Sequence, residues 1–152
     1  MSKFSSTLRK LYYRLRGKRW WHNRVYPADF SVEHLDDCRL RVHYQGRRMD
    51  MHTVAALSDT LVGRTLHVIL SGPSVKNITA PERLTREFCF TVNGSPALFE
   101  AQGLLFDAYI ADDPGFVKQH AADVVRYAAR AQYCFLSYRS VCILLMQGFD
   151  LR

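Results

Sequence analysis

The chain of 152 residues has the length and composition of one globular domain, because 48% of its residues are hydrophobic and 23% are charged. No apolar run reaches the length of a membrane span, which excludes a polytopic membrane protein. The formal net charge of +7 is concentrated in residues 1–24, where eight lysines and arginines occur without one acid, so the remainder is close to neutral.

The cysteines and histidines show no metal-binding or disulfide pattern. The four cysteines form no CxxC pair, and the six histidines lack the spacing of zinc ligands. We therefore expect Cys38, Cys89, Cys134 and Cys142 to be mostly small core residues of a protein in a reducing compartment. The N-terminus also lacks the apolar stretch of a secretory signal, which favours a cytoplasmic location.

Residues 1–28 predict a basic amphipathic segment ahead of the domain. Apolar side chains recur at the spacing of one helical face, at Phe4, Leu8, Leu11, Tyr12 and Leu15. The helix is expected to end near Gly17, and the pair Trp20-Trp21 follows it. Such a segment suits peripheral attachment of residues 1–26 to the anionic inner face of the cytoplasmic membrane. One alternative is a solvated helix that packs on the domain through a narrow apolar stripe. Another is that the basic residues bind nucleic acid.

The next elements are a strand and a helix. Residues 39–44 alternate between polar and apolar side chains, which predicts a half-buried strand. Residues 46–48 then turn the chain. The apolar residues between Met51 and Leu61 predict a helix, and Gly63 marks its end.

The segment from residue 65 onward predicts a parallel sheet. Short apolar runs at 66–70, 88–92 and 106–111 alternate with helix-compatible segments at 80–86 and 96–102. A longer helix is expected at 116–130, followed by buried strands at 133–136 and 141–146. This alternation is typical of a three-layer, Rossmann-like α/β domain with helices on both faces, here over residues 29–152. A strand at 141–146 would leave an apolar edge through which two copies of the chain could pair.

Small and polar residues follow three consecutive strands of this predicted sheet. The first strand leads into Ser71, Gly72, Pro73 and Ser74, the second into Asn93, Gly94 and Ser95, and the third into Asp112. Ligands of open α/β sheets bind at the carboxyl ends of the strands. Glycine permits close approach of a ligand to the backbone, hydroxyls and helix N-termini suit a phosphate, and an asparagine suits a ribose or a base edge. These residues predict a nucleotide-binding site, although neither GxGxxG nor a Walker loop is present.

The two aspartates after the third strand, Asp112 and Asp113, raise the alternative hypothesis of a metal site. Paired carboxylates hold a divalent ion in many sugar-nucleotide transferases. Adjacent side chains of an extended segment point to opposite sides, however, so we expect Asp113 to cap the following helix and expect no metal site. Asp112 and His120 remain the candidates for a catalytic role.

The three strand ends resemble those of a known family. The residues Leu66 to Ser74, Phe90 to Ser95 and Asp107 to Asp112 are similar to the bacterial Kdo (octulosonic acid) transferases of lipopolysaccharide core biosynthesis, and more distantly to bacterial CMP-sialic-acid transferases. The resemblance covers residues 63–113, about a third of the chain. It implies a donor such as CMP-Kdo, a pocket for CMP at the strand ends, and inverting transfer that requires no tightly bound metal.

For the whole protein, the resemblance implies a glycosyltransferase-like role in lipopolysaccharide core or capsule assembly. The acceptor of the sugar would be the lipopolysaccharide core or another glycan. The members of that family are longer, and their general base lies in the later half. The alternatives are therefore a shortened transferase without activity, and a non-catalytic module that binds nucleotide or nucleic acid.

Overall fold

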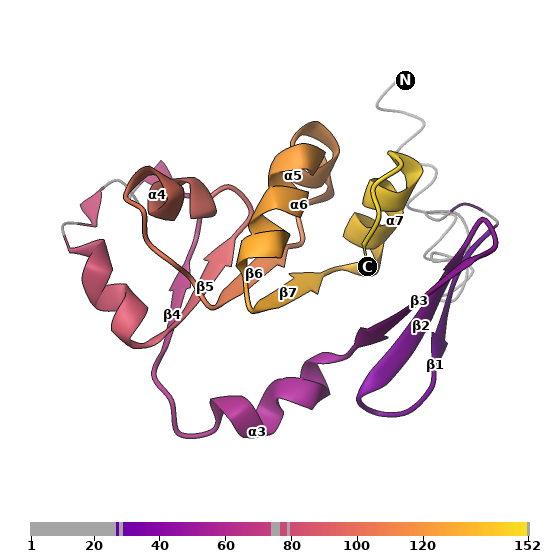
Figure 1. The fold of residues 1–152 in the computed structure, drawn as a ribbon, viewed down its shortest axis with the longest axis horizontal. Coiled ribbons are helices and arrows are strands. Elements are labelled where there is room, and N and C mark those ends of the chain that lie inside the picture. The colour runs from indigo at the N-terminus through magenta and orange to yellow at the C-terminus, as the bar shows by residue number, and fades with distance from the viewer. Residues whose placement is uncertain (1–26, 28, 74–76, 79, 152) are drawn as a thin grey trace, which may run out of the picture.

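The computed structural model describes residues 27, 29–73, 77–78 and 80–151, and these form an α/β fold with two sheets (Figure 1). The larger sheet is Rossmann-like and has the order β4-β5-β6-β7, with every neighbouring pair parallel. Its strands are β4 (Leu66–Ile69), β5 (Phe88–Val92), β6 (Ala108–Ala111) and β7 (Tyr133–Leu136). The four strands agree with the predicted apolar runs, which confirms the α/β class.

Short helices link these strands. Residues Pro81–Arg86 form the 3-10 helix η3, Pro96–Ala101 form α4, and Pro114–Gln119 and Ala121–Arg130 form α5 and α6. The helix predicted at 116–130 is thus two helices. His120 separates them because its backbone, at φ −124° and ψ 34°, is not helical.

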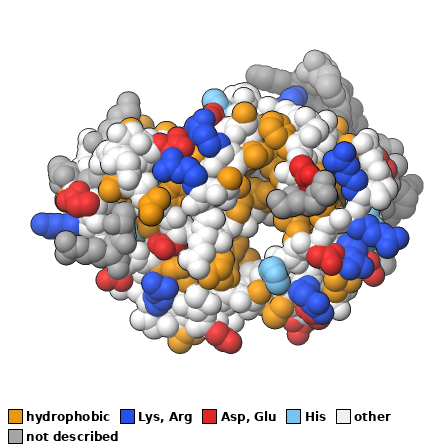
Figure 2. Space-filling model, in the orientation of Figure 1, with side chains coloured by type: hydrophobic (Ala, Val, Ile, Leu, Met, Phe, Trp, Pro, Cys, Tyr) orange, Lys and Arg blue, Asp and Glu red, His pale blue; other side chains and the backbone are white. Residues whose placement is uncertain are grey.

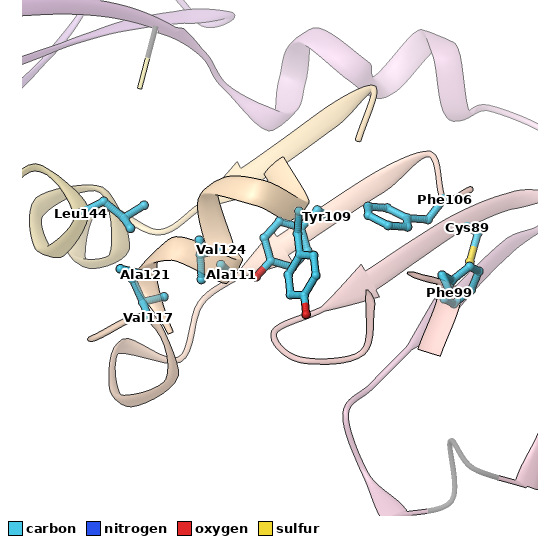
Figure 3. Close-up of a cluster of buried hydrophobic side chains, with 10 residues drawn as sticks. Cys89, Phe99, Phe106, Tyr109, Ala111, Val117, Ala121, Val124 and Leu144 are labelled. Carbon is cyan, nitrogen blue, oxygen red and sulfur yellow. The ribbon is translucent and has the colours of Figure 1, made fainter. Parts of the chain in front are cut away.

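The two faces of the parallel sheet have different surroundings. On one face, Cys89, Tyr109 and Ala111 are buried under the helices in one cluster, in which Phe99 lies beside Cys89 and Val124 beside Ala111 (Figure 3). The order of the strands explains this arrangement, since successive right-handed crossovers between adjacent parallel strands deliver their helices to the same face. The opposite face is also apolar and carries Phe88, Phe90, Ile110, Tyr133 and Phe135.

The segment that reaches this opposite face begins as a 3-10 helix and continues as a short α-helix. Residues Val54–Leu57 form η1 and Ser58–Leu61 form α3, and Leu61 packs against the apolar face. Gly63, at φ +74°, ends the helix as predicted. The start of the predicted helix was wrong, because Met51 belongs to a strand.

A second, antiparallel sheet precedes this segment. It contains β1 (Phe30–His34), β2 (Arg39–Tyr44) and β3 (Arg47–His52), paired in that order. The strand at 39–44 is confirmed. The turn expected at residues 46–48 is tighter, because Gln45 and Gly46 take it with φ of +48° and +74°, and β3 starts at once.

Helix α7 (Tyr138–Met146) joins the two sheets, and the prediction of a strand at 141–146 was wrong. Val141, Cys142 and Leu145 pack on the antiparallel sheet, whereas Leu144 packs with α5 and α6. A segment buried on two sides has no polar face, so its sequence shows no helical periodicity. Ser137 marks the true start, since its hydroxyl accepts a hydrogen bond from the Ser140 N–H. The unpaired edge expected from a strand here is therefore absent.

The basic amphipathic helix predicted within residues 1–28 lies outside the described residues, apart from Pro27. Among the residues that the structure describes, no helix combines the length and apolar character needed to cross a bilayer.

Candidate nucleotide site and adjoining cavity

The carboxyl ends of β4 and β5 meet the start of α5. A side chain added at Gly94 would come within 3.3 Å of the Phe116 ring and 3.9 Å of the Ser71 Cβ. Glycine at this position thus allows close packing against Phe116, and its backbone conformation is an ordinary one. The structure brings Ser71 and Gly94 together, as expected of neighbouring strand ends.

Asn93 connects this region to the end of β6. Its backbone lies in the left-handed region at φ +51°, an uncommon conformation for a residue with a side chain. The Asn93 N–H donates to the Ile110 carbonyl at 2.8 Å, and its Oδ1 accepts from the Asp113 N–H at 3.4 Å. Its side-chain NH₂ makes no hydrogen bond with any described residue. Within the described part of the chain, Asn93 therefore presents a side-chain donor without a partner at the sheet edge.

Ser95 is part of the framework of this region. It is 2% exposed, and its Oγ donates to the Ile69 carbonyl at 2.7 Å and accepts from the Val92 N–H at 2.8 Å. The hydroxyl proton is thus already used, and the two bonds hold the ends of β4 and β5 together. We assign Ser95 a positioning role, which differs from the ligand contact expected from the sequence.

The helices that follow these strand ends offer few free N–H groups. Both α4 and α5 begin with a proline, which has none. In α5 the next N–H, that of Gly115, donates to Asp113 Oδ1 at 2.8 Å, which confirms the predicted cap. A phosphate bound here would depend on the loop after β4, where Gly72 is half-buried and Pro73 exposed, while Ser74 lies outside the described residues.

His120 lies over the same region. Its ring stacks on Phe116 with centroids 4.8 Å apart and an angle of 23° between planes. Its Nδ1 is 3.5 Å from an Asp123 carboxylate oxygen, and the side chain is exposed. Phe116 and His120 thus extend an aromatic surface from Gly94, which sequence reasoning missed because it treated Phe116 only as the start of a helix.

Asp112 faces a separate space, a cavity of about 460 Å³ between the two sheets. The carboxyl ends of β6 and β7 form one wall, and the ends of β1 and β3 form the other. Figure 2 shows the molecule hollowed there, with hydrophobic side chains around the opening. The cavity is a second candidate site, and Asp112 is the predicted site residue that lines it.

The cavity contains polar residues that were not predicted from the sequence, three of which carry a ring. They are His34, His52 and Tyr138, from β1, β3 and α7. The Tyr138 hydroxyl lies 3.4 Å from His34 Nε2. These residues are far apart in the chain, so only the packing of α7 on the antiparallel sheet reveals that they belong together.

The histidines, cysteines and acidic residues that the structure describes form no metal-binding cluster at these sites. The described residues contain no group of three His, Cys, Asp or Glu side chains placed to hold a metal ion. All four cysteines are free, with Cys89 and Cys142 buried and Cys38 and Cys134 exposed. Burial raises the pKa of the Cys89 thiol to about 11, which keeps it protonated at neutral pH.

Compared with known proteins, the chain has no significant match among family models, curated proteins or solved structures. The resemblance to the transferases, drawn from the strand-end residues, therefore stays a prediction.

Proposed function

We propose that this chain binds the cytidine monophosphate part of an activated sugar acid such as CMP-Kdo. It would then act as the donor-binding part of a glycosyltransferase of lipopolysaccharide core or capsule assembly. The observation that carries the proposal is the position of Asn93. It lies in a strained conformation at the carboxyl edge of a Rossmann-like sheet, and its side-chain NH₂ makes no hydrogen bond with any described residue.

The surroundings of Asn93 support a nucleotide as the ligand. The stacked rings of Phe116 and His120 provide an aromatic face for a base, and this face lies beside Gly94. The Asn93 NH₂ can donate to a carbonyl of the base or to a ribose oxygen. The loop that contains Gly72 would receive the phosphate.

Isothermal titration of the full chain with CMP tests this proposal directly. We expect saturable binding of CMP that is stronger than binding of AMP. Absence of binding at millimolar CMP by a folded protein would contradict the nucleotide site.

Two substitutions separate the side chain of Asn93 from its backbone strain. Asn93→Gly removes the carboxamide and relaxes the left-handed backbone, whereas Asn93→Ala removes the carboxamide and keeps the strain. Both variants should weaken CMP by about tenfold, since each lacks the same hydrogen bond. If Asn93→Gly binds CMP as tightly as the unchanged chain, Asn93 is not a contact.

The charge of residues 1–24 supports a peripheral location at an anionic membrane, with nucleic acid as the alternative partner. Liposome co-sedimentation and DNA retention should be compared for the full chain and for a chain without residues 1–26. We expect retention on anionic vesicles that is lost on deletion. Retention on DNA in preference to anionic vesicles would favour the nucleic-acid alternative.

A further inference from the structure

We propose that the free edge of strand β4 pairs with the same edge of a second copy of the chain, which joins the two parallel sheets into one. The two β4 strands run antiparallel about a two-fold axis at Val68. This proposal goes beyond the proposed function and holds whether or not the chain binds CMP.

Strand β4 lies at one end of the parallel sheet (Figure 1). Its partner among the described residues is β5, so the other side of the strand has no described strand beside it. Alternate residues of a strand direct their N–H and C=O groups to opposite sides, and those on the free side of β4 can pair with another strand. Such an edge is a ready site for a further strand.

The same edge carries a row of exposed apolar side chains. Leu66, Val68 and Leu70 are 42%, 57% and 62% exposed. They alternate along the chain and so share one face of the sheet, and the register places Leu66 and Val68 beside Phe88 and Phe90 of β5. Phe88 and Phe90 are buried. The row on β4 is therefore the uncovered margin of an apolar face that is otherwise covered.

The sequence of the strand does nothing to block pairing. Natural sheet edges are protected by charged side chains, by proline or by a bulge. Residues 65–70 contain no lysine, arginine, acid or proline, and the register of β4 with β5 is unbroken. Arg64 precedes them, but its guanidinium lies over the Phe88 ring, 5.2 Å from the centroid. Its charge is thus held over the sheet face and away from the free edge.

A second copy fits this edge better than the basic segment at residues 1–24 does. Residues 62–73 contain no acidic side chain that could attract its eight lysines and arginines. Antiparallel pairing about Val68, in contrast, places each Leu66 opposite Leu70 of the other copy and each Val68 opposite its counterpart. The two rows then form one apolar strip on the same face of the joined sheet, and no like charges meet along it.

The size of the contact sets the strength of the dimer. Three partly exposed side chains from each copy bury less than the roughly 1,200–2,000 Å² of a stable interface. Backbone hydrogen bonds between the two strands add to this apolar contact. We therefore expect a reversible dimer with a Kd on the order of 10–100 µM.

Sedimentation velocity of the full chain, from about tenfold below to tenfold above this Kd, tests the proposal. We expect the sedimentation coefficient to rise from that of a monomer to that of a dimer. A monomer throughout this range would overturn the proposal. Hydrogen exchange of residues 65–70 should slow over the same range, and exchange that does not depend on concentration would place the contact elsewhere, which also overturns it.

A lysine at the proposed axis tests the position of the contact. Val68→Lys places two ammonium groups opposite each other and should weaken the dimer at least about tenfold. Val54→Lys is the control, because Val54 is also an exposed valine, 68% exposed, but belongs to η1. The control should dimerise as the unchanged chain does. A dimer that survives Val68→Lys would show that the copies meet through another surface, contrary to the proposal.

A mixture of variants tests the two-fold pairing itself. Val68→Glu should dissociate the dimer as Val68→Lys does, and an equimolar mixture of the two should dimerise again, because a carboxylate then faces an ammonium across the axis. Recovery requires that position 68 of one copy lies opposite position 68 of the other. An edge that binds a different protein or a membrane surface would show no recovery, and that result would refute pairing about Val68.

Discussion

Replacement of Ser95 by alanine removes both hydrogen bonds that join the ends of β4 and β5. The Ser95 Oγ is bonded to the Ile69 carbonyl at 2.7 Å and to the Val92 N–H at 2.8 Å, in a residue that is 2% exposed. Water cannot replace the lost hydroxyl, and a buried polar group left unpaired costs about 1–3 kcal/mol. Because both bonds share one hydroxyl, their losses are not fully additive. We expect the free energy of unfolding to fall by about 2–4 kcal/mol.

Urea unfolding followed by circular dichroism measures this loss. Ser58→Ala is the control, because the Ser58 hydroxyl also donates to a backbone carbonyl, that of Ala55 at 3.0 Å, but is exposed. The control should change stability by less than about 0.5 kcal/mol. If Ser95→Ala costs no more than the control, the reasoning that Ser95 is a buried positioning residue is refuted.

Three further predictions concern single side chains. Asp113→Ala should destabilise the chain by about 1 kcal/mol through loss of the α5 cap, and Asp113→Asn by less; equal losses in urea unfolding would argue against capping. Maleimide should label Cys38 in the native chain but Cys89 only after unfolding, as mass spectrometry would reveal. The raised pKa of Cys89 should also make the free energy of unfolding fall above about pH 9, because the thiol ionises more readily in the unfolded chain. The two hydrogen bonds from Arg41 lower the pKa of Asp50, so their stabilisation is present at neutral pH and is lost as pH falls below about 4. Asp50→Asn should therefore flatten the acid side of a plot of urea midpoint against pH, and an unchanged profile would contradict this.

The parallel sheet could be predicted from the sequence because its strands are short apolar runs, each followed by a polar residue, namely Ser71, Asn93, Asp112 and Ser137. The residues after β5 illustrate the limit of that reasoning. Position at a strand end led to the prediction that both Asn93 and Ser95 contact the ligand. The structure distinguishes them, because the Ser95 hydroxyl is hydrogen-bonded to two backbone groups whereas the Asn93 NH₂ is bonded to none of the residues that the structure describes.

Strand β3 and helix α7 were missed for opposite reasons. The alternation of Arg48, Met49, Asp50 and Met51 does carry the signal of a half-buried strand, but the turn was placed too late in the chain to reveal it. Residues 141–146 carry no usable periodicity, because α7 is buried against both sheets. Only the serine at position 137, a preferred N-cap residue, marks the start of that helix in the sequence.

The cavity could not be predicted, because its polar residues come from β1, β3, α7 and the loop after β6. No local pattern relates His34 to Tyr138 or either of them to Asp112. Their proximity follows from tertiary packing, which single-sequence reasoning does not supply.

The segment from η1 to α3 has a consequence for how the fold opens. Neither helix contains a buried residue, although this segment is the covalent connection from one sheet to the other. Backbone with so few buried contacts opens at low free energy and is where proteases cut first. Since α7 packs on both sheets, a chain cut between residues 53 and 65 would remain one particle. The two fragments could then be made separately and reassembled, with the noncovalent contact through α7 in place of the peptide link.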